Sequence, residues 1–198
     1  MRKSLYQSSI VVFLCLVSVS WGTIQSINVN YVDSVYTATG GTLVLSDAAD
    51  VVVEDTLGNQ TAYTNGSFAM NTVLAADVSA GGMASGQFAG GSLAFLDSGA
   101  NTLLSGAVVS LNLVEVFNNV GILAGEGQFQ VTGGSLAGDF VLPLGNIVQI
   151  TFQVSPATLS DLSKDFKGVS NLTITPVPEP VTIGLLTMGG LFLSRRKR

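Results

Sequence analysis

Hydrophobic and polar residues alternate with a period of two along most of the chain. In residues 148–154, four apolar side chains alternate with Gln149, Thr151 and Gln153. Successive side chains of a strand point to opposite faces, so this pattern predicts a half-buried β-strand. Residues 26–31 repeat the pattern, which predicts that Ile27, Val29 and Tyr31 point into a core.

Other segments show a similar alternation or lie between turn residues. They are residues 42–46, 51–54, 61–70, 86–95, 107–117, 127–132 and 169–175. Within 61–70, Asn65-Gly66 is a strong hairpin signal, because a tight type I′ turn needs positive φ at both central residues. In 107–117 the apolar positions slip by one step at Val114 and Val116, which predicts a bulge near Leu113.

One segment has helical rather than strand spacing. Ser155-Pro156 is a favourable N-cap and first-turn pair, and Leu159, Leu162 and Phe166 follow it at intervals of three and four residues. We therefore expect a short helix over residues 156–166.

Many short strands separated by turn signals predict an all-β domain over residues 23–175. We expect a two-layer antiparallel β-sandwich, with a jelly-roll order as one arrangement of its strands. A domain of about 150 residues buries roughly 70% of the surface that its unfolded chain exposes, so one core can stabilise it without disulfides.

The N-terminus has the three parts of a secretory signal peptide. Arg2 and Lys3 precede the apolar residues 10–19, and small residues follow up to Gly22. We expect residues 1–22 to form a signal helix that is cleaved after Gly22 or, alternatively, after Ser20. An uncleaved anchor is disfavoured, because a spanning helix needs about 20 apolar residues.

The C-terminus carries a second distinctive pattern. Pro178-Glu179-Pro180 lies in a proline-rich linker over residues 176–180, which the prolines keep extended and accessible to a protease. The apolar residues 181–193 follow, and a helix of this length spans about 20 Å, less than the bilayer core of about 30 Å. Residues 181–198 therefore predict a short apolar helix that inserts transiently. Its basic end stays cytoplasmic by the positive-inside rule and consists of Arg195, Arg196, Lys197 and Arg198.

Together with the signal peptide, this tail resembles the PEP-CTERM sorting domain of exosortase substrates in Gram-negative bacteria. The resemblance is limited to the two ends; Val181 stands where such tails commonly carry Ala, and Lys197 interrupts the arginines. It implies that a membrane-embedded, exosortase-like protease recognises Pro178, Glu179 and Pro180 and cuts nearby. The body would then pass from the inner membrane to the cell surface or the extracellular matrix. An unprocessed C-terminal membrane anchor is the alternative.

The charge and composition of the body exclude several classes of function. Between residues 23 and 178 there are two lysines, no arginine and twelve acidic residues, a formal charge of −10, so this stretch repels nucleic-acid phosphates. The chain has no histidine, and its one cysteine, Cys15, lies in the predicted signal peptide. The mature chain therefore cannot build Ser-His, Cys-His or His-metal centres.

Carboxylates are the remaining candidates for chemistry. Paired glutamates suit glycoside hydrolysis, and Glu54, Glu115 and Glu126 are available, but the body has no arginine or tryptophan to hold a sugar. We therefore expect no enzyme activity.

Calcium is the cofactor that an acidic body suits best. The weak candidates for ligands are Asp47, Asp50, Glu54 and Asp55. Their spacing is not that of an Asp-x-Asp-x-Asp-Gly loop, so solvated turn carboxylates are the favoured interpretation, with no metal and no cofactor.

These observations predict an exported, non-enzymatic protein of the cell surface or extracellular matrix, with a structural or adhesive role in an exopolysaccharide biofilm. Its partners would be the export machinery, the exosortase-like protease, and exopolysaccharide or further copies of itself, joined through polar faces or strand edges. A calcium-dependent carbohydrate-binding module is the alternative.

Overall fold

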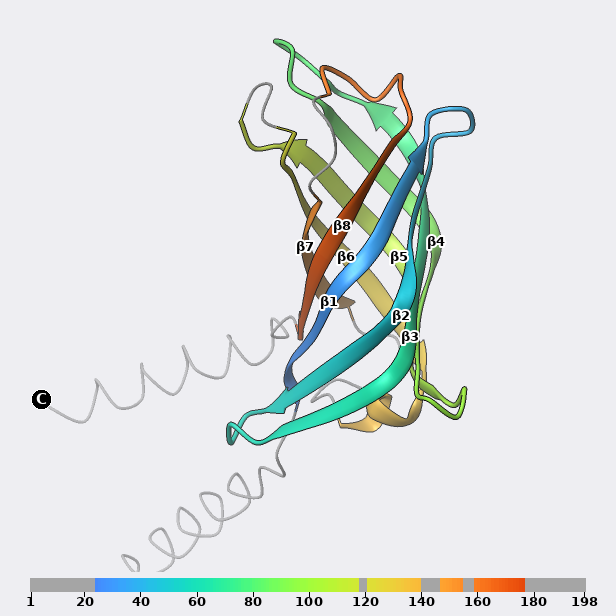
Figure 1. Cartoon of the computed structure of the whole chain (residues 1–198), viewed down its shortest axis with the longest axis vertical. Helices are drawn as coiled ribbons and strands as arrows, with labels where there is room; N and C mark the ends of the chain where they lie inside the picture. Colours follow the sequence, from blue (N-terminus) through green and yellow to red (C-terminus); the bar gives the residue numbers. More distant parts are fainter. Residues whose placement is uncertain (1–23, 118–120, 140–146, 155–158, 177–198) are drawn as a thin grey trace, which may run out of the picture.

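The computed structural model describes residues 24–117, 121–139, 147–154 and 159–176, with only the backbone of 147–154. Within these ranges the chain forms eight strands and one short 3₁₀ helix (Figure 1). The elements are β1 (Ile24–Thr37), β2 (Thr42–Asp55), β3 (Gln60–Asp77), β4 (Ser85–Leu96), β5 (Thr102–Glu115), β6 (Leu123–Gly133), η1 (Ser135–Gly138), β7 (Ile147–Val154) and β8 (Phe166–Pro176).

The strands form one antiparallel sheet that curls and closes on itself. Each strand pairs with its neighbours in sequence, and β8 pairs with β1, so the sheet is a closed barrel in the order β1 to β8. The all-β antiparallel prediction is confirmed, but the two-layer sandwich with a jelly-roll order is not what forms. Alternation specifies one buried face, and the interior of a barrel satisfies it as well as the space between two sheets.

Two breaks that the sequence predicts between strands lie inside single strands. Residues 42–46 and 51–54 belong to one strand, β2, whose pairing with β3 shifts between Ala49 and Val51. Asn65-Gly66 lies within β3 at this shift, where Asn65 has a φ of 56°. The Asn-Gly pair therefore makes a β-bulge instead of a hairpin turn, because a bulge also uses a residue with positive φ.

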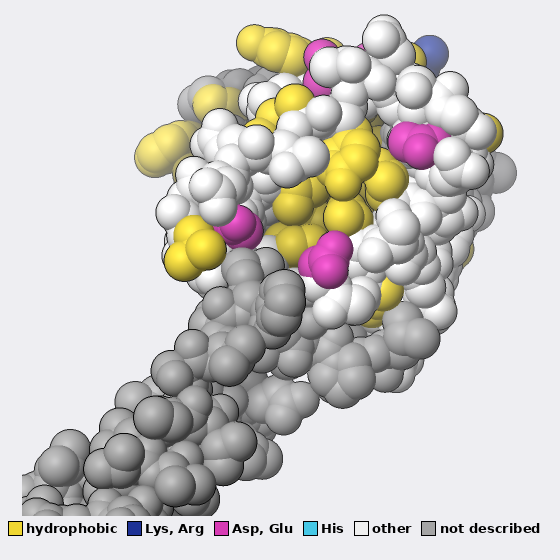
Figure 2. Space-filling view, turned by 90° about the horizontal axis from the view of Figure 1, so that it is seen from below, with side chains coloured by type: hydrophobic (Ala, Val, Ile, Leu, Met, Phe, Trp, Pro, Cys, Tyr) yellow, Lys and Arg dark blue, Asp and Glu magenta, His cyan; other side chains and the backbone are white. Residues whose placement is uncertain are grey.

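The inward-facing side chains fill the barrel. Seen from the lower end, apolar side chains occupy the centre and are surrounded by polar groups and backbone (Figure 2). Glycines make room for aromatic rings: a Cβ added at Gly106 would lie 2.2 Å from Cδ2 of Phe129. Small and large residues thus alternate across the interior, as in other small barrels.

Short segments cover both ends of the barrel. At the lower end, η1 buries Leu136 and Ala137, and the N–H of Ile24 donates to the carbonyl of Asp139 (3.0 Å). At the upper end, residues 159–165 lie across the opening and bury Leu159 and Leu162.

This upper segment corrects the helix expected over residues 156–166. Its described part, residues 159–165, consists of bends, and Phe166 already begins β8. The three apolar residues at helical spacing are all buried, but they fill the end of the barrel instead of forming one face of a helix. Spacing alone does not distinguish these two arrangements.

The two predicted targeting segments, residues 1–22 and 176–198, lie outside the described residues except for Pro176. Among the residues that the structure describes, no helix has both the length and the apolar character needed to cross a membrane.

Candidate functional site

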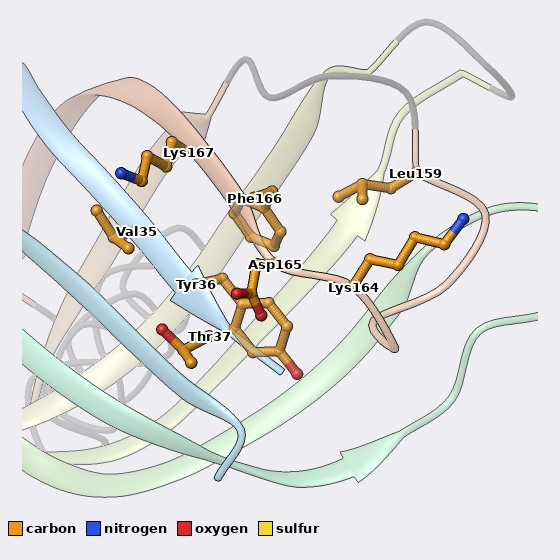
Figure 3. A pocket seen from close by; sticks show the side chains of 8 residues that line it. All are labelled: Val35, Tyr36, Thr37, Leu159, Lys164, Asp165, Phe166 and Lys167. Atoms are coloured by element: carbon orange, nitrogen blue, oxygen red, sulfur yellow. The ribbon is translucent and has the colours of Figure 1, made fainter. Parts of the chain in front are cut away.

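A pocket of about 630 Å³ lies at the upper end of the barrel (Figure 3). It is formed where the end of β1 and the start of β8 meet the upper segment, residues 159–165. The lining residues are Val35, Tyr36, Thr37, Leu159, Lys164, Asp165, Phe166 and Lys167. Because β1 and β8 are at opposite ends of the sequence, only closure of the barrel brings this pocket together.

Tyr36 forms the floor of the pocket. Its ring stacks on Phe166, with centroids 5.0 Å apart and planes 25° apart, and it meets the ring of Phe88 edge-on at 6.0 Å. Its hydroxyl donates to the backbone carbonyl of Leu162 (3.0 Å). Burial, and to a lesser extent the charges of nearby aspartates, raises the pKa of Tyr36. The phenol therefore stays protonated and acts as a buried donor that fixes the upper segment.

The rim of the pocket carries the two lysines of the body. Lys164 and Lys167 are its only cations between residues 23 and 178, and both line the pocket. Figure 3 shows their amino groups on opposite sides of the pocket, with Asp165 between them above the ring of Tyr36. The Asp165 carboxylate accepts a hydrogen bond from the N–H of Ala38 (2.8 Å), which holds the upper segment to the turn after β1. The body's positive charge is thus concentrated at its upper end.

The four carboxylates considered as calcium ligands are used separately. Asp47 accepts from the N–H of Ala48 (2.6 Å), and Asp50 accepts from the N–H of Asn65 (3.0 Å) at the bulge in β3. Glu54 accepts from the side-chain amide of Gln60 (3.3 Å) across the β2–β3 pair.

Asp55, the fourth, closes the turn between β2 and β3. It accepts from the N–H groups of Leu57 (2.8 Å) and Asn59 (2.9 Å) and from the amide of Asn59 (2.8 Å). These bonds, above all those from Asn59, lower the pKa of Asp55. No group of three or more carboxylate, histidine or cysteine side chains that could hold a metal ion occurs among the described residues.

The two glutamates Glu115 and Glu126 lie on opposite faces of the barrel wall. Glu126 is exposed on the outside of β6, whereas Glu115 is 1% exposed at the upper end of β5. The Glu115 carboxylate accepts from the N–H groups of Ala84 and Gly121, both at 3.2 Å. Glu115 therefore holds two loops together at the upper end. Glu115 and Glu126 do not face a common space, as two carboxylates that hydrolyse a glycosidic bond must.

The bulge expected near Leu113 is not found there. Alternation continues through Leu111 and Leu113 to Glu115 on the inside, so Val114 faces out. The two register shifts against β6 lie earlier, between Ser105 and Gly106 and between Val108 and Ser110.

The alternation in residues 26–31 predicts that Tyr31 points into the core, but Tyr31 lies on the outside of the barrel. Its side chain is 77% exposed, its φ is 61°, and the next residue, Val32, takes the inward position. The period-two pattern could not reveal this, because an extra residue in β1 reverses the alternation there.

The residues of the predicted sorting signal lie outside the described ranges. This holds for the cleavage position Gly22, for Pro178, Glu179 and Pro180, and for the basic cluster of Arg195, Arg196, Lys197 and Arg198.

No protein-family model, curated protein or solved structure matches this chain.

Proposed function

We propose that the chain is an exported, non-enzymatic protein of the cell surface or extracellular matrix, sorted through its C-terminal tail. The observation that supports this best is the position of the two ends of the barrel. Because β1 and β8 are antiparallel neighbours, Ile24 and Pro176 both lie at the lower end, whereas the pocket lies at the upper end (Figure 1).

This arrangement suits a protein whose tail is anchored in the membrane and whose barrel is exposed outside it. One residue after Pro176, the sorting motif Pro178-Glu179-Pro180 begins, and the apolar residues 181–193 follow it. A tail inserted in the inner membrane would hold the lower end close to the bilayer and leave the pocket facing away from it. Cleavage near Glu179 by an exosortase-like enzyme would then free the whole barrel, because β8 is complete before the motif begins.

The barrel also favours one kind of matrix contact over another. Pairing between strand edges needs an open edge, and the pairing of β1 with β8 leaves none in the described sheet. Contacts through exposed side chains, with exopolysaccharide as the partner, are therefore favoured over self-association through edges. No observation favours the calcium-dependent alternative, since the four candidate carboxylates are used separately by local hydrogen bonds.

Sorting is tested in the host. Exported wild-type protein should lack the segment from about Pro180 onward, and the Glu179→Ala variant should be exported but stay attached to the membrane. Intact-mass measurement of surface protein and fractionation of membranes give the two readouts. Wild-type surface protein that still ends in Arg198 would contradict sorting by cleavage.

The matrix role is tested with the exported protein purified from its host. It should co-sediment with the host's extracellular polysaccharide both in calcium and in chelator. Binding in calcium alone would support the carbohydrate-binding module instead, and absence of binding in both would contradict the matrix contact.

A further inference from the structure

The outer wall of the barrel has an irregularity at Asn30 and Tyr31. On β1, Val29 pairs with Leu172 and Val32 pairs with Ser170, so two residues of β1 lie opposite the single residue Asn171 of β8. This is a β-bulge, a feature that re-aims side chains and is common next to functional sites. Here it turns Tyr31 from the inside of the barrel to the outside.

Tyr31 is unfavourable for the fold in two ways. Its φ of 61° is in the left-handed region, which L side chains rarely adopt and which suits Gly, Asn or Asp better. Its aromatic ring is 77% exposed, whereas Tyr36, Phe68, Phe88, Phe95 and Phe129 are buried. A strained residue that also exposes an aromatic ring points to a function, because neither property stabilises the folded protein.

The bulge is nevertheless well fixed. The backbone N–H of Tyr31 donates to Oδ1 of Asn171 (3.1 Å), a residue 140 positions away in the sequence. The amide nitrogen of Asn171 is not used in this bond. The ring of Tyr31 is thus presented from a rigid wall, next to amide groups that can donate and accept hydrogen bonds.

Among the described residues of β1 and β8 around the bulge, the exposed neighbours of Tyr31 are mainly polar and include no lysine or arginine. Asn30 precedes it in the bulge, and Asp33 and Val169, which pair across β1 and β8, are both exposed. An aromatic ring beside amide groups matches a sugar, whose C–H face packs on the ring while its hydroxyls bond to the amides. Because Asp33 and the body's charge of −10 repel polyanions, the match is to a neutral sugar chain.

We propose that Tyr31, together with Asn30 and Asn171, is a contact site for a neutral polysaccharide on the outer wall of the barrel. This inference rests on the proposed matrix function and names the residues that perform it. The site lies at the bulge between β1 and β8 and is separate from the upper pocket. The proposal does not depend on what the pocket binds.

The test uses the exported protein purified from its host and the host's extracellular polysaccharide, separated by anion exchange into neutral and acidic fractions. Wild-type protein should co-sediment with the neutral fraction. Tyr31→Ala and Tyr31→Gly should each weaken this binding about tenfold, the range expected for loss of one aromatic contact with its neighbouring hydrogen bonds. Phe117→Ala is the matched control, because Phe117 is also an exposed aromatic residue, at 62%, and its loss should leave binding unchanged.

Tyr31→Gly separates a lost contact from a lost fold. Glycine adopts positive φ without strain. The melting temperature of the Tyr31→Gly variant should therefore equal or exceed that of the wild type, while its binding to the polysaccharide falls. Loss of binding together with a lowered melting temperature in both variants would overturn the assignment of Tyr31 as a contact residue.

The remaining outcomes distinguish the inference from the function on which it rests. If wild-type protein binds the neutral fraction and both Tyr31 variants bind equally well, the contact site is wrong and the matrix function stands. If wild-type protein binds neither fraction, the matrix function fails and the site fails with it. If light scattering shows that Tyr31→Ala dissociates an oligomer of the wild type, the surface joins copies of this chain and the polysaccharide site is overturned.

Discussion

At the scale of single residues, few of the described side chains inside the barrel are polar, and most of these have hydrogen-bond partners. Ser34 and Ser170 are both fully buried and share a hydrogen bond across β1 and β8. Glu115 accepts from two loop N–H groups. Thr72 differs, because its hydroxyl is buried and makes no hydrogen bond in the structure. These residues show that burial of a polar group stabilises the fold only where a partner is present.

Replacing Thr72 should therefore stabilise the protein. Thr72→Val keeps the shape of the side chain and removes a buried hydroxyl without a partner, so we expect a gain of about 1 kcal/mol in the free energy of unfolding. Ser170→Ala is the contrasting change. It leaves the Ser34 hydroxyl without its partner and should lower the stability by about 1–3 kcal/mol. Urea unfolding of the two variants measures both, and a lower midpoint for Thr72→Val than for wild type would contradict the first expectation.

At the scale of elements, the upper segment over residues 159–165 is held by a few identifiable contacts. Leu162 is wedged into the barrel, so that a Cβ added at Gly86 would lie 2.3 Å from its Cδ1. The Tyr36 hydroxyl holds the Leu162 carbonyl, and Asp165 holds Ala38. Within the segment, Asp161 accepts hydrogen bonds from Ser160 and Ser163. The contacts through Tyr36 and Asp165 hold the segment to β1 and to the turn that follows it.

Tyr36→Phe should loosen this segment. Loss of one buried hydrogen bond is worth about 1 kcal/mol, so the open state should become several-fold more populated. Cleavage by trypsin measures this opening, because Lys164 and Lys167 are the only tryptic sites between residues 23 and 178. We expect cleavage at Lys164 to be several-fold faster in Tyr36→Phe than in wild type. Tyr63→Phe, at the lower end, is the control, and equal rates in all three proteins would show that the hydroxyl does not hold the segment.

In two turns at the lower end, an aspartate accepts hydrogen bonds from the backbone of the turn and from an asparagine side chain. In the turn after β4, Asp97 accepts from the N–H groups of Gly99 and Asn101 and from the Asn101 amide, as Asp55 does with Asn59 after β2. The side-chain amide is the largest cause that lowers the pKa of each aspartate below the ordinary value of 3.8, followed by the backbone bonds. Each carboxylate therefore stabilises its turn only while it is ionised.

These lowered pKa values predict how stability depends on pH. A carboxyl group whose pKa is lower in the folded state stabilises the fold above its unfolded pKa, and the stabilisation disappears as the pH falls through the folded pKa. Removing both carboxylates with Asp55→Asn and Asp97→Asn should lower the urea midpoint at neutral pH. The gap to wild type should narrow as the pH falls below the ordinary carboxyl value of 3.8 and both aspartates become protonated. Ser98→Ala in the same turn should show no such pH dependence, and a gap of constant size would contradict the assignment.

Particular elements show how far the sequence predicts this fold. Period-two alternation locates segments in all eight strands, since it depends on neighbours within each strand. It does not distinguish a bulge from a hairpin at Asn65-Gly66, and it misplaces Tyr31, because both depend on the register with another strand. Lys164 and Lys167 stand out by composition, but the pocket around them requires the pairing of β1 with β8, which no local pattern encodes.

At the scale of the whole molecule, the barrel has a defined direction. The turn after β1, with Thr39, lies at the upper end, whereas the turn after β4, with Ser98, lies at the lower end, as do the start of β1 and the end of β8 (Figure 1). Val181, where the apolar tail begins, is the fifth residue after Pro176, and a fully extended chain of this length spans at most about 18 Å. A barrel held by its tail must therefore keep its lower end close to the membrane.

This direction can be measured on spheroplasts, which lack an intact outer membrane, from cells that retain the protein through Glu179→Ala. The mature chain has no cysteine, because Cys15 precedes the predicted cleavage position, so Thr39→Cys and Ser98→Cys each introduce a unique thiol. A polyethylene-glycol maleimide should label the Thr39→Cys variant much faster than the Ser98→Cys variant, since the membrane shields the lower end. The same two thiols should react at similar rates in protein that has been released from the membrane. Equal labelling in the retained protein would mean that the tail does not orient the barrel, and faster labelling at Ser98→Cys would mean that the pocket faces the membrane.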